Sequence, residues 1–455
     1  MIQVNVTLTE TIKVLLEEKK YSTLRDILTT MKPFDIAAVF EELQDEKTPI
    51  LFRILPKELA AETFVEMDED TQEFLIHGFS DNELKEVVDE LFVDDAVDLI
   101  EEMPANVVKR ILRQADKETR RQINELLKYP EDSAGSIMTT EFISLRPDMT
   151  AEMAIKRIRR PGVDKETIYT CYVNDDYNRL IGITTVKDLL LADDDDLVKD
   201  MMEENVISVH TLDDQEMVAR IFSDYDFLAL PVVDNEQRIV GIVTIADAID
   251  VIREAATEDI EKMAAVLPSD KPYMRPSVWG IYKKRVPWLL VLMLSATFTS
   301  TIISAFDGML ASVIILSSFI PMITGSGGNA GSQASVSVIR ALSLGEIEFK
   351  SMFKVLWKEL RVAALCGLTL AAANFVKLMV FDLRGNENAV VIALVVSLTL
   401  VGTIIMAKIV GSSLPLLSSK IGLDPAVMAN PLISTVCDSL SLLIYFGVAS
   451  TLLDL

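Results

Sequence analysis

Histidine and cysteine are scarce in this chain of 455 residues. Its two histidines, His77 and His210, lie far apart in the sequence. Its three cysteines, Cys171, Cys366 and Cys437, show no spacing typical of a metal site or a disulfide framework. A zinc site built on these residues is therefore not expected, and the soluble part of the chain fits a reducing cytoplasm.

Sequence motifs of enzymes and of calcium-binding loops are also missing. The chain has no Walker motif, no nucleophile–base constellation and no EF-hand loop. We therefore expect neither an enzyme nor an EF-hand calcium protein. Residues 1–20 are charged and amphipathic, so we do not expect a signal peptide at this end.

Positive charge is in short supply over the first part of the chain. Before Arg285 there are 60 acidic and 33 basic residues, a net charge of −27, whereas nine acidic and ten basic residues follow from that point. This pattern predicts an acidic soluble part joined to an apolar membrane domain. The excess negative charge would repel nucleic acid and favours cations as partners. Solubility alone is the alternative explanation for scattered surface carboxylates.

Residues 1–135 are predicted to form an acidic, all-helical domain. Apolar residues recur at helical spacing over residues 84–103 and 105–127. The segments ILPKELAAETFVEMD and LFVDDAVDLIEEMP read as two copies of one helical unit, which predicts stacked helical hairpins in a small superhelix. Asp94 and Asp98 are four residues apart and share one helix face. Taken alone, they fit a solvated helix start.

Residues 136–250 contain an internal repeat, with copies at about 136–200 and 201–250. Residues 138–158 pair with 202–222, and residues 179–190 pair with 238–249. Each copy is predicted to contain a helix, a strand pair and a closing helix that a Thr-x-x-Asp sequence opens. These sequences are Thr185 to Asp188 and Thr244 to Asp247. The threonine can cap its helix without any ligand.

Carboxylates are dense in the second copy of the repeat and in the helix predicted after it. Clusters of isolated carboxylates suit Mg²⁺, which keeps most of its waters and takes one or two protein oxygens. A helix of about six turns is predicted over residues 246–268, with acidic side chains along part of its surface: Glu254, Glu258, Asp259 and Glu261. The acidic run at residues 193–196 is expected to be a solvated loop.

Five membrane spans are predicted within residues 275–455. They lie near residues 286–306, 308–340, 362–381, 389–414 and 425–453. Basic residues before the first span and between the second and third place those segments on the cytoplasmic side, so the C-terminus would lie outside. Lys377 and Lys408 lie near span ends. Inside the spans we find no ionisable group other than Asp438, and the spans show no inverted repeat.

Glycine is concentrated in the second span. Residues 308–339 carry no charge, and four of the seven residues from Gly325 to Gly331 are glycine. Glycine weakens a helix and lets another backbone come close. Asn329 and Gln333 are four residues apart and share a helix face. This stretch is either a pore-lining segment or a close-packed helix contact, and the residues leave both interpretations open.

Asp438 is a lone carboxylate among apolar neighbours in the fifth span. An ionisable group at such a position is costly and is by default a functional-site hypothesis. Pro431 is expected to free backbone carbonyls about one turn earlier, near Val427. A twofold dimer would bring two copies of Asp438 to one axis, where they would match a divalent charge.

The pattern Pro-x-x-x-Gly-x-x-Gly-Asn-x-Gly-x-Gln at residues 321–333 resembles the signature of the MgtE family of magnesium channels and transporters. The order of the parts resembles that family along nearly the whole chain, and the internal repeat resembles a pair of CBS domains. The resemblance implies an all-α superhelical N domain (1–135), an α/β CBS pair (136–250), a connecting plug helix (246–268) and a five-helix membrane domain (275–455).

The resemblance also implies a function. We expect a homodimeric channel, with its pore at the dimer interface in the cytoplasmic membrane, that imports Mg²⁺ and closes when Mg²⁺ binds to the acidic domains. A cation-coupled secondary transporter of Mg²⁺, Co²⁺ or Mn²⁺ is the alternative. ATP is a second candidate ligand, because Thr-x-x-Asp often holds a ribose in CBS pairs.

Site residues follow from the same resemblance. The expected pore ligands are Asp438, Asn430 and Val427, and the expected pore-lining residues are Gly325, Gly328, Asn329 and Gln333. The expected regulatory Mg²⁺ ligands are Asp94, Asp98, Asp214, Glu216, Asp226, Asp247, Asp250, Glu258, Asp259 and Asp424. The nucleotide candidates are Thr185, Asp188 and Phe227. Ala255 stands where the family pattern leads us to expect a carboxylate.

Overall fold

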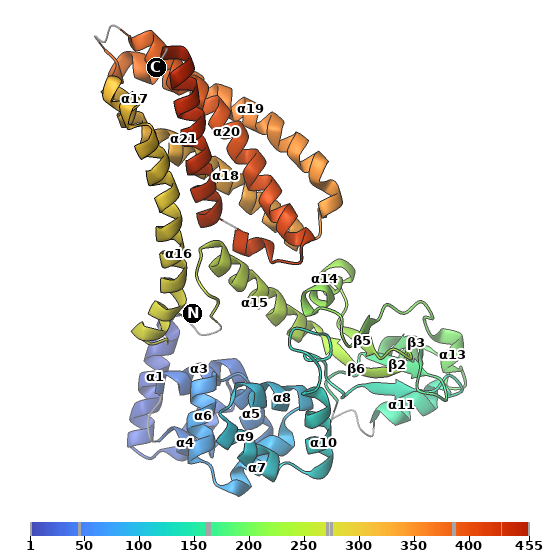
Figure 1. The fold of residues 1–455 in the computed structure, drawn as a ribbon. Coiled ribbons are helices and arrows are strands. Elements are labelled where there is room, and N and C mark those ends of the chain that lie inside the picture. The colour runs from blue at the N-terminus through green and yellow to red at the C-terminus, as the bar shows by residue number, and fades with distance from the viewer. Residues whose placement is uncertain are drawn as a thin grey trace. The chain divides into compact units, whose positions relative to one another are not determined.

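The computed structural model describes residues 2–43, 47–159, 165–269, 273, 276–384, 388–428 and 430–453, with the side chains of 2–7, 428 and 430 left undescribed. Contacts divide the chain into two compact units, Met1–Ile252 and Arg253–Leu455. Figure 1 shows the elements of both, and each unit is considered separately below.

The first unit begins with short helices, as predicted. They are α1 (Ile2–Glu17), α2 (Tyr21–Leu28), α3 (Pro33–Leu43), α4 (Thr48–Phe52), α5 (Lys57–Val65), α6 (Glu69–Gly78), α7 (Asp81–Glu90), α8 (Val93–Glu102), α9 (Ala105–Gln114) and α10 (Lys117–Leu126). Polar residues before the helices fix several starts. At α7, Ser80 and Glu83 form a capping box, in which each side chain bonds the other residue's backbone N–H.

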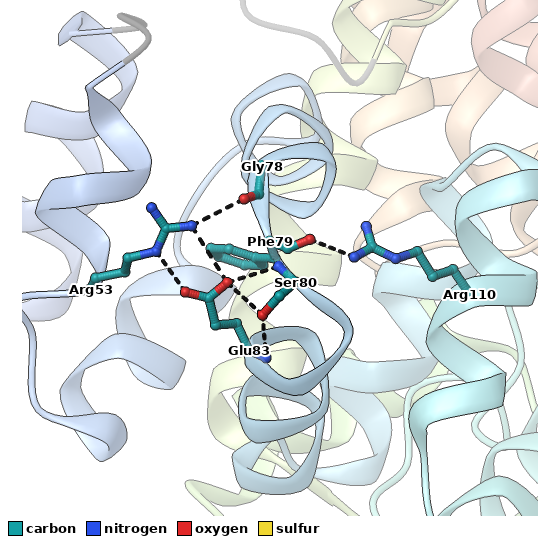
Figure 2. Close-up of polar contacts among 6 residues, drawn as sticks. All are labelled: Arg53, Gly78, Phe79, Ser80, Glu83 and Arg110. Atoms are coloured by element: carbon teal, nitrogen blue, oxygen red, sulfur yellow. Dashed lines mark hydrogen bonds and ion pairs between the residues drawn. The ribbon is translucent and has the colours of Figure 1, made fainter.

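Two arginines tie neighbouring helices to the turn between α6 and α7 (Figure 2). Arg53 donates to the carboxylate of Glu83 at 2.6 Å and to the carbonyl of Gly78 at 3.1 Å. Arg110, from α9, donates to the carbonyl of Phe79 at 2.5 Å. The hydrogen bond from Arg53 lowers the pKa of Glu83 to about 2. Charged hydrogen bonds therefore link the end of α4 and helix α9 to this turn.

The repeat over residues 136–250 forms two small three-stranded sheets. The first contains β1 (Ile143–Leu145), β2 (Thr170–Asn174) and β3 (Leu180–Thr185); the second contains β4 (Val209–His210), β5 (Ala229–Val233) and β6 (Ile239–Thr244). In both sheets the first two strands are parallel and the last two antiparallel. The sequence predicted a strand pair in each copy but neither its direction nor the short first strand, which has too few residues to show a period.

Helices complete each copy of the repeat. They are α11 (Ala151–Arg159), α12 (Val186–Leu191) and α13 (Val198–Met201) in the first copy and α14 (Gln215–Tyr225) in the second. The two copies pack reciprocally through a glycine and a methionine. A Cβ on Gly182 would lie 2.6 Å from Met202 Sδ, and one on Gly241 would lie 2.7 Å from Met138 Sδ. Equivalent residues thus make equivalent contacts, so the sequence repeat is also a structural one.

Helix α15 (Ile245–Met263) follows β6 and ends earlier than predicted. The expectation that it continues to residue 268 is wrong, because Ala265 adopts a left-handed backbone with φ of 54°. The N–H of Leu267 then bonds the carbonyl of Lys284 instead of continuing the helix. The boundary between the two units falls within α15.

The second unit is a bundle of long helices. They are α16 (Val278–Ala305), α18 (Ile320–Ser343), α19 (Met352–Lys377), α20 (Ala389–Lys420) and α21 (Asn430–Leu453). Shorter elements join them: α17 (Asp307–Ser312), η2 (Ile314–Phe319), η3 (Phe349–Ser351), η4 (Leu378–Asp382) and η5 (Pro425–Met428). Among the described residues, four helical segments are long and apolar enough to cross a membrane: 278–305, 349–382, 389–420 and 431–453.

The predicted second span is not one helix. The chain turns through α17 and η2 before α18 begins at Ile320, just ahead of Pro321. Proline is favoured in the first turn of a helix, because the N–H that it lacks has no partner there. Glycine, serine and amide residues lower the hydropathy of α18, which is not among the four apolar segments.

Glycines let α18 approach both α20 and α21. A Cβ on Gly411 of α20 would overlap the carbonyl oxygen of Gly331, and one on Gly331 would lie 2.8 Å from Cys437 Sγ of α21. A Cβ on Gly327 would lie 2.8 Å from the methyl group of Thr403. This side of the glycine stretch is therefore a close-packed helix contact.

We expect Gly411→Ala to lower the thermal unfolding midpoint of the full chain in detergent. The added methyl must push two backbones apart, and overpacking of this kind costs about 1–3 kcal/mol. Gly447→Ala is the control, because a Cβ there meets nothing within 4 Å. Equal midpoints for the two variants would contradict the close contact.

Candidate metal sites and pore-lining surface

The glycine stretch of α18 presents two different faces. Gly327, Gly328 and Gly331 are buried against other helices, whereas Gly325, Asn329 and Gln333 are exposed within this single chain. A Cβ on Gly325 would meet nothing within 4 Å. Three of the four expected pore-lining residues thus lie on the exposed face, whereas Gly328 lies on the packing face. The amide-bearing face is open to a partner, water or an ion.

Asp438 of α21 lies beside the buried face of α18. A Cβ on Gly328 would be 3.5 Å from Asp438 Oδ1 and 3.6 Å from Ser434. The side chain of Asp438 is partly buried, and within the described residues it forms no ion pair. The missing side chain at Gly328 therefore leaves room for a carboxylate against the helix backbone.

The other two expected pore ligands precede Asp438 in the chain, Val427 in η5 and Asn430 at the start of α21. Val427 is partly buried in η5, and the side chain of Asn430 lies outside what the structure describes. Pro431 is the second residue of α21, so the carbonyl of Val427 lies before the helix rather than inside it. A proline in that position begins a helix without freeing a carbonyl inside it.

Six carboxylates gather in the first unit around the start of α8. They are Asp94, Asp95, Asp98, Glu141, Glu166 and Asp247. Burial and neighbouring charges, Asp247 first among them, raise the pKa of Asp94 to about 6. Burial and the charge of Asp94 also raise the pKa of Asp95 to about 8 and that of Asp98 to about 7. Burial is the largest cause for Glu141 and Glu166, whose pKa values rise to about 7.

The sequence predicted Asp94, Asp98 and Asp247 as ligands, and the structure brings these three together. The sequence did not predict Asp95, Glu141 or Glu166 as ligands. Asp95 could have been inferred from its place beside Asp94, but Glu141 and Glu166 lie in loops with no pattern to mark them.

Two oxygens in this cluster have no partner. Oδ1 of Asp94 and Oε2 of Glu141 are buried without a hydrogen bond, and such atoms usually find one. Carboxylate oxygens are the ligands that Mg²⁺ prefers, so the donor set fits this ion. Among the described residues, no group of three or more Asp, Glu, His or Cys is arranged to hold one metal ion directly.

The remaining expected ligands of the second CBS copy do not share one place. Asp214 caps the start of α14, bonding the N–H groups of Glu216 and Met217, whereas Asp226 ends the same helix in a left-handed conformation. The two aspartates are thus about 18 Å apart along the helix. These side chains and that of Asp250 are exposed. Within one chain, Asp214 and Asp226 cannot bind the same ion.

In the second unit, the last turns of α15 meet the segment after α20. Lys262 lies 2.6 Å from Glu258 and 2.5 Å from Asp424, two of the expected ligands. Asp259 accepts a hydrogen bond from Ser343 at 3.2 Å, and burial raises its pKa. The structure thus joins Glu258 and Asp424 through a lysine that the sequence reasoning missed.

The nucleotide candidates Thr185 and Asp188 bond each other. They form a capping box at the start of α12, with Thr185 Oγ1 donating to Asp188 at 2.5 Å. Thr244 and Asp247 repeat this bond at 2.7 Å in the second copy. The capping explanation therefore accounts for the first Thr-x-x-Asp sequence. In the second, Asp247 also accepts the N–H of Thr244 at 3.0 Å. Phe227 stacks on Tyr225, with ring centroids 5.5 Å apart.

Ionisable groups other than Asp438 do lie within the long helices, contrary to expectation. Lys408, on α20, has only 7% of its side chain exposed and lies 3.4 Å from Glu359 on α19. Lys377, the last residue of α19, is by contrast mostly exposed and pairs with Asp382 of η4. Sequence position suggested a span end for Lys408, but α20 runs on to Lys420.

Three family models match the chain. The MgtE divalent cation transporter model matches residues 320–448, the MgtE intracellular N domain model matches 31–132, and the CBS domain model matches 134–195 and 198–254.

Curated relatives match almost the whole chain. The magnesium transporter MgtE of Thermus thermophilus is 37% identical over 443 residues, covering 96% of this chain and 97% of the relative. The MgtE of Bacillus subtilis is 31% identical over 441 residues, covering 96% and 95%. A crystal structure of the cytosolic domain of the Mg²⁺ channel MgtE in complex with ATP is 37% identical, with a TM-score of 0.51, covering 53% of this chain and 99% of that one.

We expect the full chain, free of divalent cations, to unfold at a lower temperature at pH 8.5 than at pH 6. The raised pKa values mean that the folded state holds more protons than the unfolded state between about pH 4 and pH 8. Stability therefore falls as pH rises through that range. The fall should be on the order of 5 °C, and Mg²⁺ added at pH 8.5 should reverse it.

Asp95→Asn should reduce this dependence on pH, because it removes one repelling charge. Asp195→Asn, in the exposed acidic loop, is the matched control and should leave it unchanged. Scanning fluorimetry at the two pH values measures both variants. An Asp95→Asn protein with the parent's full pH dependence would show that the cluster does not set it.

Proposed function

The chain belongs to the MgtE family of divalent cation transporters, and on that premise we propose that it imports Mg²⁺ across the cytoplasmic membrane through a channel. The observation that carries the proposal is Asp438, a partly buried carboxylate beside Gly328 that forms no ion pair with any residue the structure describes. A carboxylate inside a membrane needs a cation to offset its charge. The relatives' names identify that cation as Mg²⁺.

We propose that the pore forms between two copies of the chain. Each copy would contribute one Asp438, and two carboxylates on a twofold axis match one divalent charge. The exposed face with Gly325, Asn329 and Gln333 would line the pore, and Asn430 and the backbone of Val427 would add oxygens near its end. Mg²⁺ keeps several of its waters, so few direct ligands are needed.

We propose a topology with five membrane spans. We propose α18 as the fifth span beside the four apolar segments, because its 24 residues reach about 36 Å. Its polar residues are tolerable where they face other helices or a pore. The acidic domains would then lie in the cytoplasm and the C-terminus outside.

We propose that the channel closes when cytosolic Mg²⁺ is high. Without cations the carboxylates around α8 repel one another, and bound Mg²⁺ would draw them together. The ligands in the first unit would be Asp94, Asp98, Asp214, Glu216, Asp226, Asp247 and Asp250. Shifting a gate from 1:99 to 99:1 takes about 5.5 kcal/mol. A site filled to ten times its dissociation constant in the closed state alone gives about 1.4 kcal/mol. About four weak sites would therefore suffice.

Domain boundaries and a nucleotide ligand are proposed on the same grounds. We propose the boundaries 1–135, 136–250 and 275–455, with α15 as the connecting plug helix. ATP is a candidate ligand of the CBS pair because the cytosolic domain of a relative was crystallised with it. Thr185, Asp188 and Phe227 would contact it, although the bond between Thr185 and Asp188 would first have to open.

Ion-coupled transport is the second candidate, favoured by the buried pair of Lys408 and Glu359. A buried ion pair adds little stability over apolar packing, so its presence suggests another use. If the pair coupled a second ion, Lys408→Met with Glu359→Gln would abolish the dependence of uptake on the proton or sodium gradient. For a channel, uptake in the parent should follow only the Mg²⁺ gradient and the membrane potential.

We expect Asp438→Asn to reduce Mg²⁺ uptake by at least about tenfold. Losing one tenfold factor corresponds to about 1.4 kcal/mol, a modest part of the interaction between a divalent ion and two carboxylates. Uptake into proteoliposomes at low inner Mg²⁺ measures the effect. Asp307→Asn, at an exposed position at the start of α17, is the matched control. Parent-level uptake by the Asp438 variant would remove this residue from the pore.

A further inference from the structure

A lysine holds the last turns of α15 against the segment that joins α20 to α21. Nζ of Lys262 lies 2.5 Å from Asp424 Oδ2 and 2.6 Å from Glu258 Oε1. Glu258 is one turn earlier on the same helix, whereas Asp424 is 162 residues further along the chain. One ammonium group thus joins carboxylates from two elements.

The surrounding contacts fix this arrangement. Oδ1 of Asp424 accepts the N–H of Ala426 at 2.7 Å, which leaves Oδ2 for the lysine. Met263, the next residue on α15, packs against Ile339 and Ala426. Two carboxylates lie within 2.6 Å of the ammonium and favour its charged form. The lysine is therefore charged where it docks.

The Lys262 ammonium offsets only part of the negative charge around it. Glu258, Asp259 and Asp424 bring three negative charges to this contact, and Asp259 is held there by Ser343. Without a cation, the two carboxylates of α15 would repel Asp424 and favour separation. With the ammonium in place, two negative charges remain, which one divalent cation would balance.

We propose that Lys262 is a built-in cation that keeps α15 docked on the membrane helices, so that Mg²⁺ supplies only the rest of the closing free energy. The second half of this statement rests on the proposed function, closure by cytosolic Mg²⁺, with Glu258, Asp259 and Asp424 as the expected regulatory ligands of the second unit. The docking contact itself does not. Lys262 and Asp424 keep 21% and 35% of their side chains exposed, so water and salt weaken the contact and its effect is moderate.

Docking can be measured without transport through the reactivity of a cysteine placed at Met263. The full chain would carry Met263→Cys with Cys366→Ala, because Cys366 is the exposed native cysteine and Cys171 and Cys437 are buried. In divalent-free buffer, Lys262→Met should speed alkylation of this cysteine about two- to fivefold, the range for a partly exposed ion pair. Lys262→Arg, which keeps the charge, should leave alkylation slow.

Lys350→Met is the matched control. Lys350 is 90% exposed and pairs loosely with Glu348, so its loss removes the same charge without touching α15. An alkylation rate in Lys262→Met equal to that of the parent, or an equal rise in Lys350→Met, would overturn the proposal.

A second measurement connects docking to gating. The cytosolic Mg²⁺ concentration that halves the current should rise about two- to fivefold in Lys262→Met. A fall would overturn the proposal, because it would mean that the ammonium competes with Mg²⁺. If the parent shows no Mg²⁺-dependent closure at all, the proposed function fails, while the alkylation result still decides whether Lys262 holds α15.

Discussion

Repulsion between carboxylates is the constraint on which the rest of this structure depends. Around α8 the fold holds Asp94, Asp95 and Asp98 close to Asp247, and each is more easily protonated than a free aspartate. At the end of α15, the ammonium of Lys262 offsets the repulsion between Glu258 and Asp424. A proton, a lysine or a bound cation can each neutralise such a cluster. Only the cation couples neutralisation to the concentration of Mg²⁺.

In the membrane helices, glycines make room for a carboxylate and allow close packing. Gly328 leaves room for Asp438 at the surface of α18, while Gly331 and Gly411 bring α18 and α20 into backbone contact. A larger residue at any of these positions would separate the helices or displace the carboxylate. The glycine stretch therefore positions a charge on one face and keeps its amide groups available on another. In the proposed pore, one segment would thus serve both helix packing and ion binding.

Local patterns in the sequence predicted much of this fold. Helical spacing, the internal repeat and the Thr-x-x-Asp caps depend on neighbours in the chain, and each predicted its element. Glu141 and Glu166 could not be assigned to the cluster, because they reach it only through the packing of loops. The pairs Lys262 with Asp424 and Lys408 with Glu359 join distant segments. The end of α15 at Met263 depends on the backbone turn at Ala265, which has no glycine to mark it.

We propose that cytosolic Mg²⁺ closes a pore in the same molecule. Current through excised inside-out patches containing the full chain measures this closure, with cytosolic Mg²⁺ stepped from low to high millimolar at a fixed voltage. We expect steep, reversible closure, with a slope that shows several ions acting together. A Mg²⁺ current that does not change with the cytosolic concentration would rule out this gating and leave the acidic domains with another role.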